Sequence, residues 1–169
     1  MNFLYHQVPS EMRGNILFPL NQLKEIHPDL YLKEVEKYIG REWILDERIP
    51  PLECFWNDVL FLSAIHPYTL VHQLRKVGLP IKPRWQFFVI DPVKLDPSLL
   101  TVFLYSGNGR DYEEFQKENL SRYAIIPEKT KQYFRQEAAR GQRPLLYHHI
   151  PHILYRGPIQ AAGLEIIKA

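Results

Sequence analysis

Residues 49–67, with the sequence IPPLECFWNDVLFLSAIHP, carry the pattern that decides the fold of this chain. Prolines stand near both ends, so the segment is not the middle of one long helix. Within it, residues 59–65 are largely apolar and predict a buried strand. Asn57 and Asp58 come directly before that strand, and burying such groups without partners costs a few kcal/mol. The pair therefore either holds a loop in place or holds a ligand.

The segments on the N-terminal side predict one strand and one helix. Residues 3–8 predict the strand, and residues 28–39 (PDLYLKEVEKYI) predict a helix that begins with proline and ends before a glycine. Leu32, Val35 and Ile39 share one face of that helix, opposite its charged residues. We therefore expect these three side chains to face the core.

The C-terminal side adds helices and more strands. Residues 68–77 and 128–140 predict two helices, each followed by a glycine. Strands are predicted over residues 85–90, 101–105, 145–149 and 164–167, with a turn at residues 106–109. Because the order is mixed and the strands cluster towards the C-terminal half, we expect an α+β fold in a single domain over residues 1–169.

The composition is typical of a folded chain that works in a reducing compartment. Hydrophobic residues make up 46% and charged residues 24% of the chain, which argues against disorder. The net charge of +2 lacks the basic excess of a duplex-binding surface. Cys54 is the one cysteine, so an internal disulfide and a cysteine-based zinc site are excluded. We expect a soluble, cytoplasmic protein with no membrane partner, since there is no signal peptide and no apolar run near roughly 20 residues.

Three basic side chains are candidates for binding a nucleotide. His6 ends the first predicted strand, where its imidazole can bond a ribose hydroxyl or be satisfied by a neighbouring carbonyl. Arg41 and Arg48 precede the segment at residues 49–67, and a guanidinium suits phosphate groups. Pairing with nearby acidic residues is the alternative for both arginines. No GxGxxG or P-loop pattern occurs, so the standard phosphate cradles are absent from the sequence.

Histidines and glutamates elsewhere are weaker candidates. His148, His149 and His152 lie close together, but proline at position 151 breaks any helix and adjacent strand residues point to opposite faces. We therefore expect no metal site, although one of the three histidines can line a pocket. Glu137 lies in a helical pattern and is an acidic candidate, with a solvated helix face as the alternative.

Three segments, LYHQVPSEMRGNILFPL (4–20), IPPLECFWNDVLFLSAIHPYTL (49–70) and LLYHHIPHILYRGPI (145–159), together resemble the DNA-acting ADP-ribosyltransferase toxins. The resemblance implies an ADP-ribosyltransferase-like fold, with a curved, split, mixed or antiparallel β-core and flanking helices that grip NAD. It implies that His6 contacts NAD and that Arg48, or Arg41, matches the family's arginine before the proline-led stretch. Asn57 and Asp58 then lie where that stretch enters its strand.

The sequence departs from this family at its catalytic glutamate, which is not found. The family places it shortly before the proline of the late turn, where this chain has Arg143 and Pro144. That carboxylate stabilises positive charge and orients the acceptor in ADP-ribosyl transfer. Glu137 and His149 are the remaining candidates for a catalytic group.

Three functions follow from these patterns. The first is an NAD-binding ADP-ribosyltransferase-like protein that takes a nucleotide ligand and acts on a nucleic acid or a protein. The second is a catalytically degenerate binding module of the same fold, marked by a closed cleft and an internally hydrogen-bonded His6. The third is an unrelated α+β domain in which Asn57 and Asp58 are structural.

Overall fold

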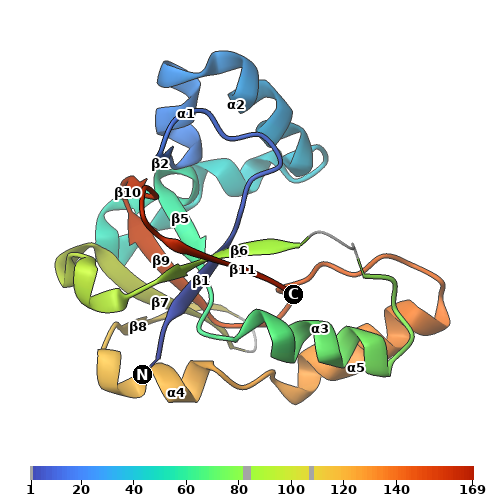
Figure 1. Ribbon diagram of the computed structural model, residues 1–169. Helices are drawn as coiled ribbons and strands as arrows, with labels where there is room; N and C mark the ends of the chain where they lie inside the picture. The colour runs from blue at the N-terminus through green and yellow to red at the C-terminus, as the bar shows by residue number, and fades with distance from the viewer. Residues whose placement is uncertain (1, 82–84, 107–108) are drawn as a thin grey trace.

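Two antiparallel sheets form the centre of the molecule (Figure 1). The computed structural model describes residues 2–81, 85–106 and 109–169. The first sheet has the order β1-β6-β11, with β1 at Leu4–Gln7, β6 at Gln86–Ile90 and β11 at Glu165–Lys168. The second sheet has the order β5-β9-β7-β8, with bounds Val59–Leu62, His152–Arg156, Leu100–Ser106 and Gly109–Glu114. The predicted α+β class is confirmed.

The two sheets meet at their edge strands, β1 and β5. Tyr5 and Ser63 form one isolated antiparallel bridge. The Tyr5 amide donates to the Ser63 carbonyl at 2.8 Å, and the Ser63 amide donates back at 3.0 Å. Since Ser63 lies just beyond the end of β5, the bridge joins the sheets at one point and leaves the rest of both edges apart.

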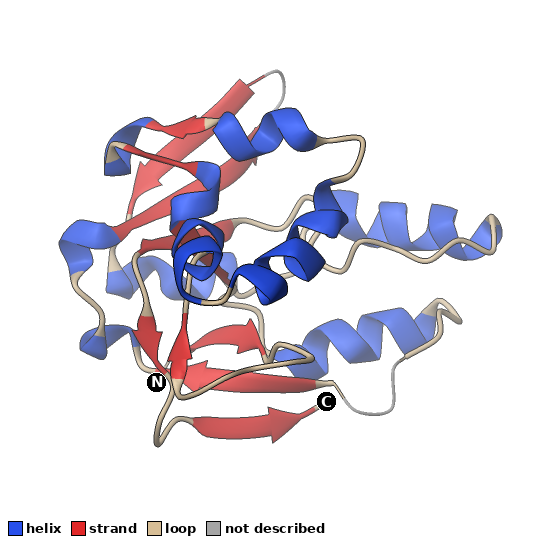
Figure 2. Ribbon diagram, turned by 90° about the horizontal axis from the view of Figure 1, so that it is seen from above, coloured by secondary structure: helices blue, strands red, loops and turns tan. Residues whose placement is uncertain are grey.

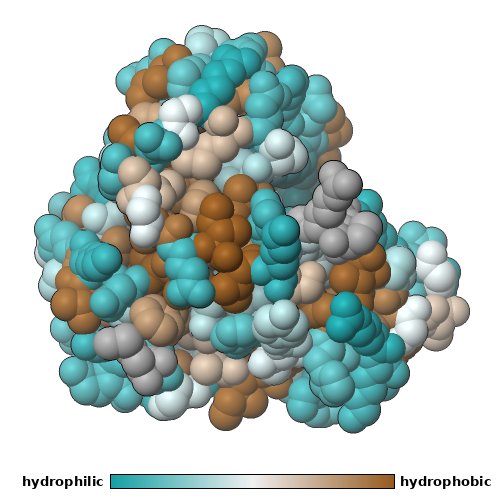
Figure 3. Space-filling model, viewed as in Figure 1, coloured by the Kyte–Doolittle hydropathy of each residue, from teal (hydrophilic) through white to brown (hydrophobic). Residues whose placement is uncertain are grey.

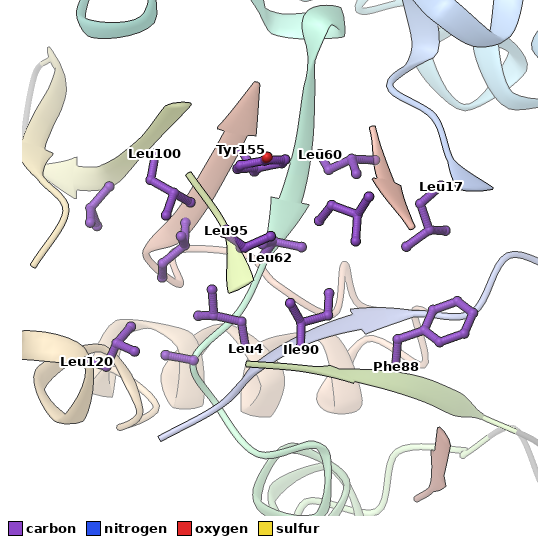
Figure 4. Close-up of a cluster of buried hydrophobic side chains, with 14 of the residues drawn as sticks. Leu4, Leu17, Leu60, Leu62, Phe88, Ile90, Leu95, Leu100, Leu120 and Tyr155 are labelled. Carbon is purple, nitrogen blue, oxygen red and sulfur yellow. The ribbon is translucent and has the colours of Figure 1, made fainter. Parts of the chain in front are cut away.

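Apolar side chains from both sheets form one core (Figure 4). Leu4 on β1 and Ile90 on β6 lie towards Leu60 and Leu62 on β5 and towards Tyr155 on β9. The four aliphatic side chains are nearly fully buried, and burying each contributes about 1.5–3 kcal/mol. This packing holds the two sheets together around the single bridge.

Helices lie on both sides of the sheets (Figures 1 and 2). α1 (Leu20–Ile26) and α2 (Pro28–Val35) form an N-terminal lobe, whereas α3 (Pro67–Lys76), α4 (Leu120–Tyr123) and α5 (Glu128–Ala139) lie at the opposite end. α3 and α5 share a buried cluster that includes Leu70, Leu74 and Phe134. Among the described residues, no helix combines the length and the apolar character needed to cross a bilayer.

Short elements complete the chain. Two small antiparallel sheets pair β2 (Ile16–Leu17) with β10 (Ile159–Gln160), and β3 (Arg48–Ile49) with β4 (Cys54–Phe55). Single 3-10 turns are η1 (Glu36–Tyr38), η2 (Glu42–Asp46), η3 (Pro50–Leu52), η4 (Trp56–Asp58), η5 (Pro92–Lys94), η6 (Pro97–Leu99) and η7 (Lys117–Asn119). Prolines begin three of these turns, η3, η5 and η6, because the fixed φ of proline suits the first helical position.

Most predicted elements occur close to their expected positions, and one does not. The strand predicted at residues 145–149 is wrong: these residues form turns, and His149 has φ 58°, in the left-handed region. The strand here is β9, which begins at His152, after Pro151. Proline has no amide hydrogen to give to a ladder, so the strand forms beyond it. Gly107 and Asn108 of the predicted turn at residues 106–109 lie outside the described residues.

The predicted inward face of α2 is also wrong. Leu32 is 61% exposed and Ile39 is 74% exposed, whereas Leu30 is the buried residue of this helix. The helix ends at Val35 and continues as the 3-10 turn η1. Leu32 and Ile39 therefore do not share one continuous helical face. Sequence spacing alone missed this because it assumed one regular helix to residue 39.

Candidate functional site

A cleft opens where the two sheets part, beside the bridge between β1 and β5. Its volume is about 580 Å³, within the range of about 300–1,000 Å³ that is common for small-molecule sites. Residues 5–8 and residues 59–63 form two of its walls, and α1 and α2 contribute a third. The space-filling view shows apolar side chains gathered over the sheets, below the largely hydrophilic N-terminal lobe (Figure 3).

The parted strand edges turn main-chain groups towards this cleft. Successive residues of a strand direct their peptide groups to opposite sides. Tyr5 directs its groups to β5, whereas the Val8 amide bonds the Gln86 carbonyl at 2.8 Å, towards β6. Gln7 therefore directs its N–H and C=O to the side of β5, which has moved away at that point. By the same alternation, the peptide groups of Phe61 face the cleft from β5.

His6 lies on β1 and lines the cleft. Its Nδ1 atom is buried and makes no hydrogen bond with the described residues. Burial lowers the pKa of His6 to about 4, a hydrogen bond between the His6 side chain and the Gln7 main chain opposes this effect, and the Lys37 charge adds to it. At neutral pH the ring is therefore uncharged, with one donor and one acceptor nitrogen. Leaving a buried nitrogen unpaired costs about 1–3 kcal/mol, which favours a ligand or water partner here.

A chain of side-chain hydrogen bonds links α1 to η4 beside the cleft. Asn57 Nδ2 donates to Asn21 Oδ1 at 2.7 Å, and Asn21 Nδ2 donates to Asp58 Oδ1 at 2.5 Å. Asp58 Oδ2 accepts from the Phe55 amide at 2.8 Å. Of these four residues, Asn57 lines the cleft. The two roles weighed for the Asn-Asp pair thus fall to different residues, with Asp58 holding the loop and Asn57 facing the cavity.

Charged side chains of the N-terminal lobe line the mouth of the cleft. The cations are Arg13, Lys33 and Lys37, and the acids are Glu11 and Glu34. Lys33 Nζ lies 2.7 Å from Glu11 Oε2, and Lys37 pairs with Glu34. These pairs are largely exposed, so each contributes little stability and can exchange partners. Arg13 makes two hydrogen bonds to the Asp29 carboxylate, so Lys33 and Lys37 are the cations of the mouth that can turn to an anionic ligand.

Aromatic side chains line the other end of the cleft. Tyr147 and His152 are part of its lining. The Tyr105 hydroxyl lies 3.0 Å from His152 Nε2. Burial lowers the pKa of His152 to about 4 and raises the pKa of Tyr147. This end is therefore neutral and lined by flat rings, which suits an aromatic or heterocyclic group.

The predicted arginines lie outside this lining. Arg41 is exposed, donates to the Lys37 carbonyl at 2.9 Å and lies 5.7 Å from the centre of the Tyr38 ring. Arg48 is exposed and lies 5.9 Å from the centre of the Phe55 ring. The structure therefore brings His6 and Asn57 together at the cleft, and places the two predicted arginines elsewhere.

The two weak catalytic candidates also lie outside the lining. Glu137 is on α5 and lies 3.7 Å from Arg140. The His149 ring packs against His148, with centroids 4.0 Å apart, and against Tyr105 at 5.6 Å. Neither residue lines the cleft, although Tyr105 contacts both His149 and the lining residue His152.

Other residues in or next to the cleft carried little signal in the sequence. Asn21 is 36 positions from Asn57, and no local pattern links them. Tyr147 and His152 lie in a segment whose strand was placed too early, so their directions were not predictable. Lys33 and Lys37 are four residues apart, and this spacing was a usable sign that two ammonium groups share one face.

Neither a metal nor a reactive thiol is indicated by the described residues. Within these residues, no three His, Cys, Asp or Glu side chains are grouped as a metal site. Cys54 is buried, and burial raises the pKa of its thiol, so it is a poor nucleophile.

Comparison with known proteins does not assign the chain to a family. No protein-family model, curated protein or solved structure matches it. The function is therefore argued from the cleft and its chemistry.

Proposed function

We propose that the chain binds NAD in the cleft between β1 and β5, as an ADP-ribosyltransferase-like protein that acts on a nucleic acid or a protein. One observation carries this proposal: the two sheets part at the Tyr5–Ser63 bridge and leave a cavity with an unpaired, buried His6 nitrogen at its edge. A split core that grips a dinucleotide is what the resemblance of three segments to the ADP-ribosyltransferase toxins implies.

The chemistry of the lining fits the parts of NAD. The main-chain groups of Gln7 and Phe61, with the His6 nitrogen, offer donors and acceptors for a carboxamide or a ribose. Lys33 and Lys37 at the mouth suit a pyrophosphate. The ring-lined end with Tyr147 suits a heterocycle.

We expect the transfer of ADP-ribose to be a slow reaction in this protein. Glu11 and Glu34 line the mouth, and each is paired with a lysine in the structure. Without a free carboxylate, the lining offers little to stabilise an oxocarbenium-like centre. We therefore expect NAD binding to be readily measurable and nicotinamide release to be slow.

The test is calorimetric titration of the protein with NAD at neutral pH. His6→Ala is expected to weaken binding about tenfold, because it removes one hydrogen bond from a buried site. His72→Ala is the matched control, since His72 is exposed on α3. Absence of binding by the unmodified protein at millimolar NAD would refute the proposal, and equal affinity of the His6→Ala variant would refute the role of His6.

A second measurement separates the transferase from a binding module of the same fold. Chromatography of an NAD incubation is expected to show nicotinamide released over hours in the presence of nucleic acid or protein. Binding without any release identifies the non-catalytic module.

A further inference from the structure

The hydrogen-bond chain behind Asn57 has a fixed direction. An aspartate carboxylate at neutral pH accepts hydrogen bonds and does not donate them. Asn21 must therefore turn its Nδ2 group to Asp58, as it does at 2.5 Å. Asn21 Oδ1 then faces Asn57, so Asn57 must turn its own Nδ2 to Asn21, at 2.7 Å. The amide orientations follow from the carboxylate, and are not an arbitrary choice between O and N.

This direction decides what Asn57 has left to offer. With one Nδ2 hydrogen bonded to Asn21, Asn57 keeps its amide oxygen in a fixed orientation together with its second Nδ2 hydrogen, and Asn57 lines the cleft whereas Asn21 and Asp58 do not. An amide oxygen accepts hydrogen bonds and repels anionic oxygen atoms. This part of the cleft therefore differs from the basic mouth formed by Lys33 and Lys37.

We infer that Asn57 is a specificity-determining residue that accepts a hydrogen bond from a donor group of the ligand, and that Asn21 and Asp58 are positioning residues that fix this polarity. The inference rests on the proposed function and deepens it. The donor is a ribose hydroxyl, the adenine amino group or the carboxamide N–H₂ of NAD, and not a phosphate. The anionic part of the ligand lies at the mouth, away from Asn57.

The inference also gives Asp58 a role at a distance from the ligand. Its Oδ2 atom accepts from the Phe55 amide and holds the turn that begins β5. Its Oδ1 atom orients Asn21 and, through it, Asn57. One carboxylate thereby couples the shape of the loop to the polarity of the cleft wall.

The test is a set of calorimetric titrations with NAD and three analogues, each lacking one donor. Deoxy-NAD forms lack a ribose hydroxyl, nicotinamide hypoxanthine dinucleotide lacks the adenine amino group, and nicotinic acid adenine dinucleotide lacks the carboxamide N–H₂. One analogue is expected to bind the unmodified protein about tenfold more weakly than NAD, which is the loss of one buried hydrogen bond. The analogue that shows this penalty identifies the donor.

The variant Asn57→Ala is then expected to bind NAD and that analogue with equal affinity. Asn21→Ala, which leaves the bond between Asp58 and Phe55 in place, is expected to reduce the penalty to about two- to threefold. Asn119→Ala is the control, because Asn119 also makes one side-chain bond, to Gln116, and lies outside the lining. A merely structural role lowers the affinity for NAD and every analogue by the same factor and leaves the penalty unchanged.

The outcomes separate this inference from the proposed function. If the unmodified protein does not bind NAD, the proposed function fails and the inference fails with it. If NAD binds but no analogue is penalised, or if the penalty persists in Asn57→Ala, the inference alone is overturned.

Discussion

At the residue scale, two half-buried histidines of the cleft, His6 and His152, make stability depend on pH. Burial lowers the pKa of His6 and of His152 to about 4, whereas an unfolded histidine titrates near 6.5. Between these values the unfolded chain binds protons that the folded chain does not. Stability is therefore complete above about pH 6.5 and is lost as the pH falls towards 4, at up to about 1.4 kcal/mol per pH unit for each histidine.

Urea unfolding at pH 7, 6 and 5 measures this effect. His6→Gln is expected to remove a substantial part of the slope over this range, because the substituted side chain no longer titrates, whereas His152 and His148, whose pKa values burial also lowers, still contribute. The carboxyls of Glu11 and Asp29, whose pKa values are lowered by hydrogen bonds to Lys33 and Arg13 respectively, act below this range. An unchanged slope in His6→Gln would show that His6 is not buried as a neutral ring.

Another prediction at this scale concerns Glu53, which follows η3 with φ 50°. A left-handed conformation costs a residue with a Cβ roughly 1 kcal/mol, and glycine adopts it freely. Glu53→Gly is therefore expected to raise the free energy of unfolding by about 0.5–1 kcal/mol in a urea titration.

The matched control is Glu36→Gly at another exposed glutamate. Glu36 has φ -56° in the right-handed helical region. There the added backbone freedom is expected to lower stability by about 0.5–1 kcal/mol. Equal effects at the two positions would rule out backbone conformation as the cause.

At the element scale, sequence patterns predicted strands and helices better than the directions of their side chains. Residues 59–65 and 68–77 carry local signals, an apolar run and a proline-to-glycine helix, and both elements form. β9 was placed too early because the apolar residues on both sides of Pro151 resemble strands, and only the missing amide hydrogen distinguishes them. The sequence also gave no sign that α2 ends at Val35, since no proline or glycine stands there.

The candidate site was predictable only in part, for the same reason. His6 and Asn57 stand at the ends of recognisable elements, but the strand pattern left open whether they hold a ligand or a neighbouring group, and only the family resemblance implied a cleft. Arg41 and Arg48 were chosen for their chemistry and their place in the sequence, but η2 and β3 lie where neither side chain lines the cleft. Asn21 was missed because its role depends on a contact between α1 and η4, which are distant in the sequence.

At the scale of the whole molecule, one shared core predicts one cooperative unfolding transition. Leu4 and Leu62 come from different sheets and are packed in the same cluster with almost no exposure. Leu4→Ala is expected to lower the free energy of unfolding by about 2–5 kcal/mol. Far-ultraviolet circular dichroism and tryptophan fluorescence are expected to agree with each other on the unfolding midpoint, both for the unmodified protein and, at a lower midpoint, for the variant.

Two midpoints would contradict this prediction and would mean that the sheets unfold separately. Val93→Ala is the control, because Val93 is 62% exposed and its truncation is expected to change stability by less than about 0.5 kcal/mol.

The order in which the chain visits the two sheets has a kinetic consequence. It begins in the first sheet with β1, crosses to the second with β5, returns with β6, crosses again for β7 to β9 and returns with β11. Neither sheet is built from one continuous segment of the chain. The middle strand β6 pairs with β1 near the N-terminus and with β11 near the C-terminus. Closing such long loops before any contact forms is entropically costly and slows folding. The architecture that holds the cleft open therefore also requires nearly the whole chain to be present before the first sheet, which spans residues 4–168, can be completed.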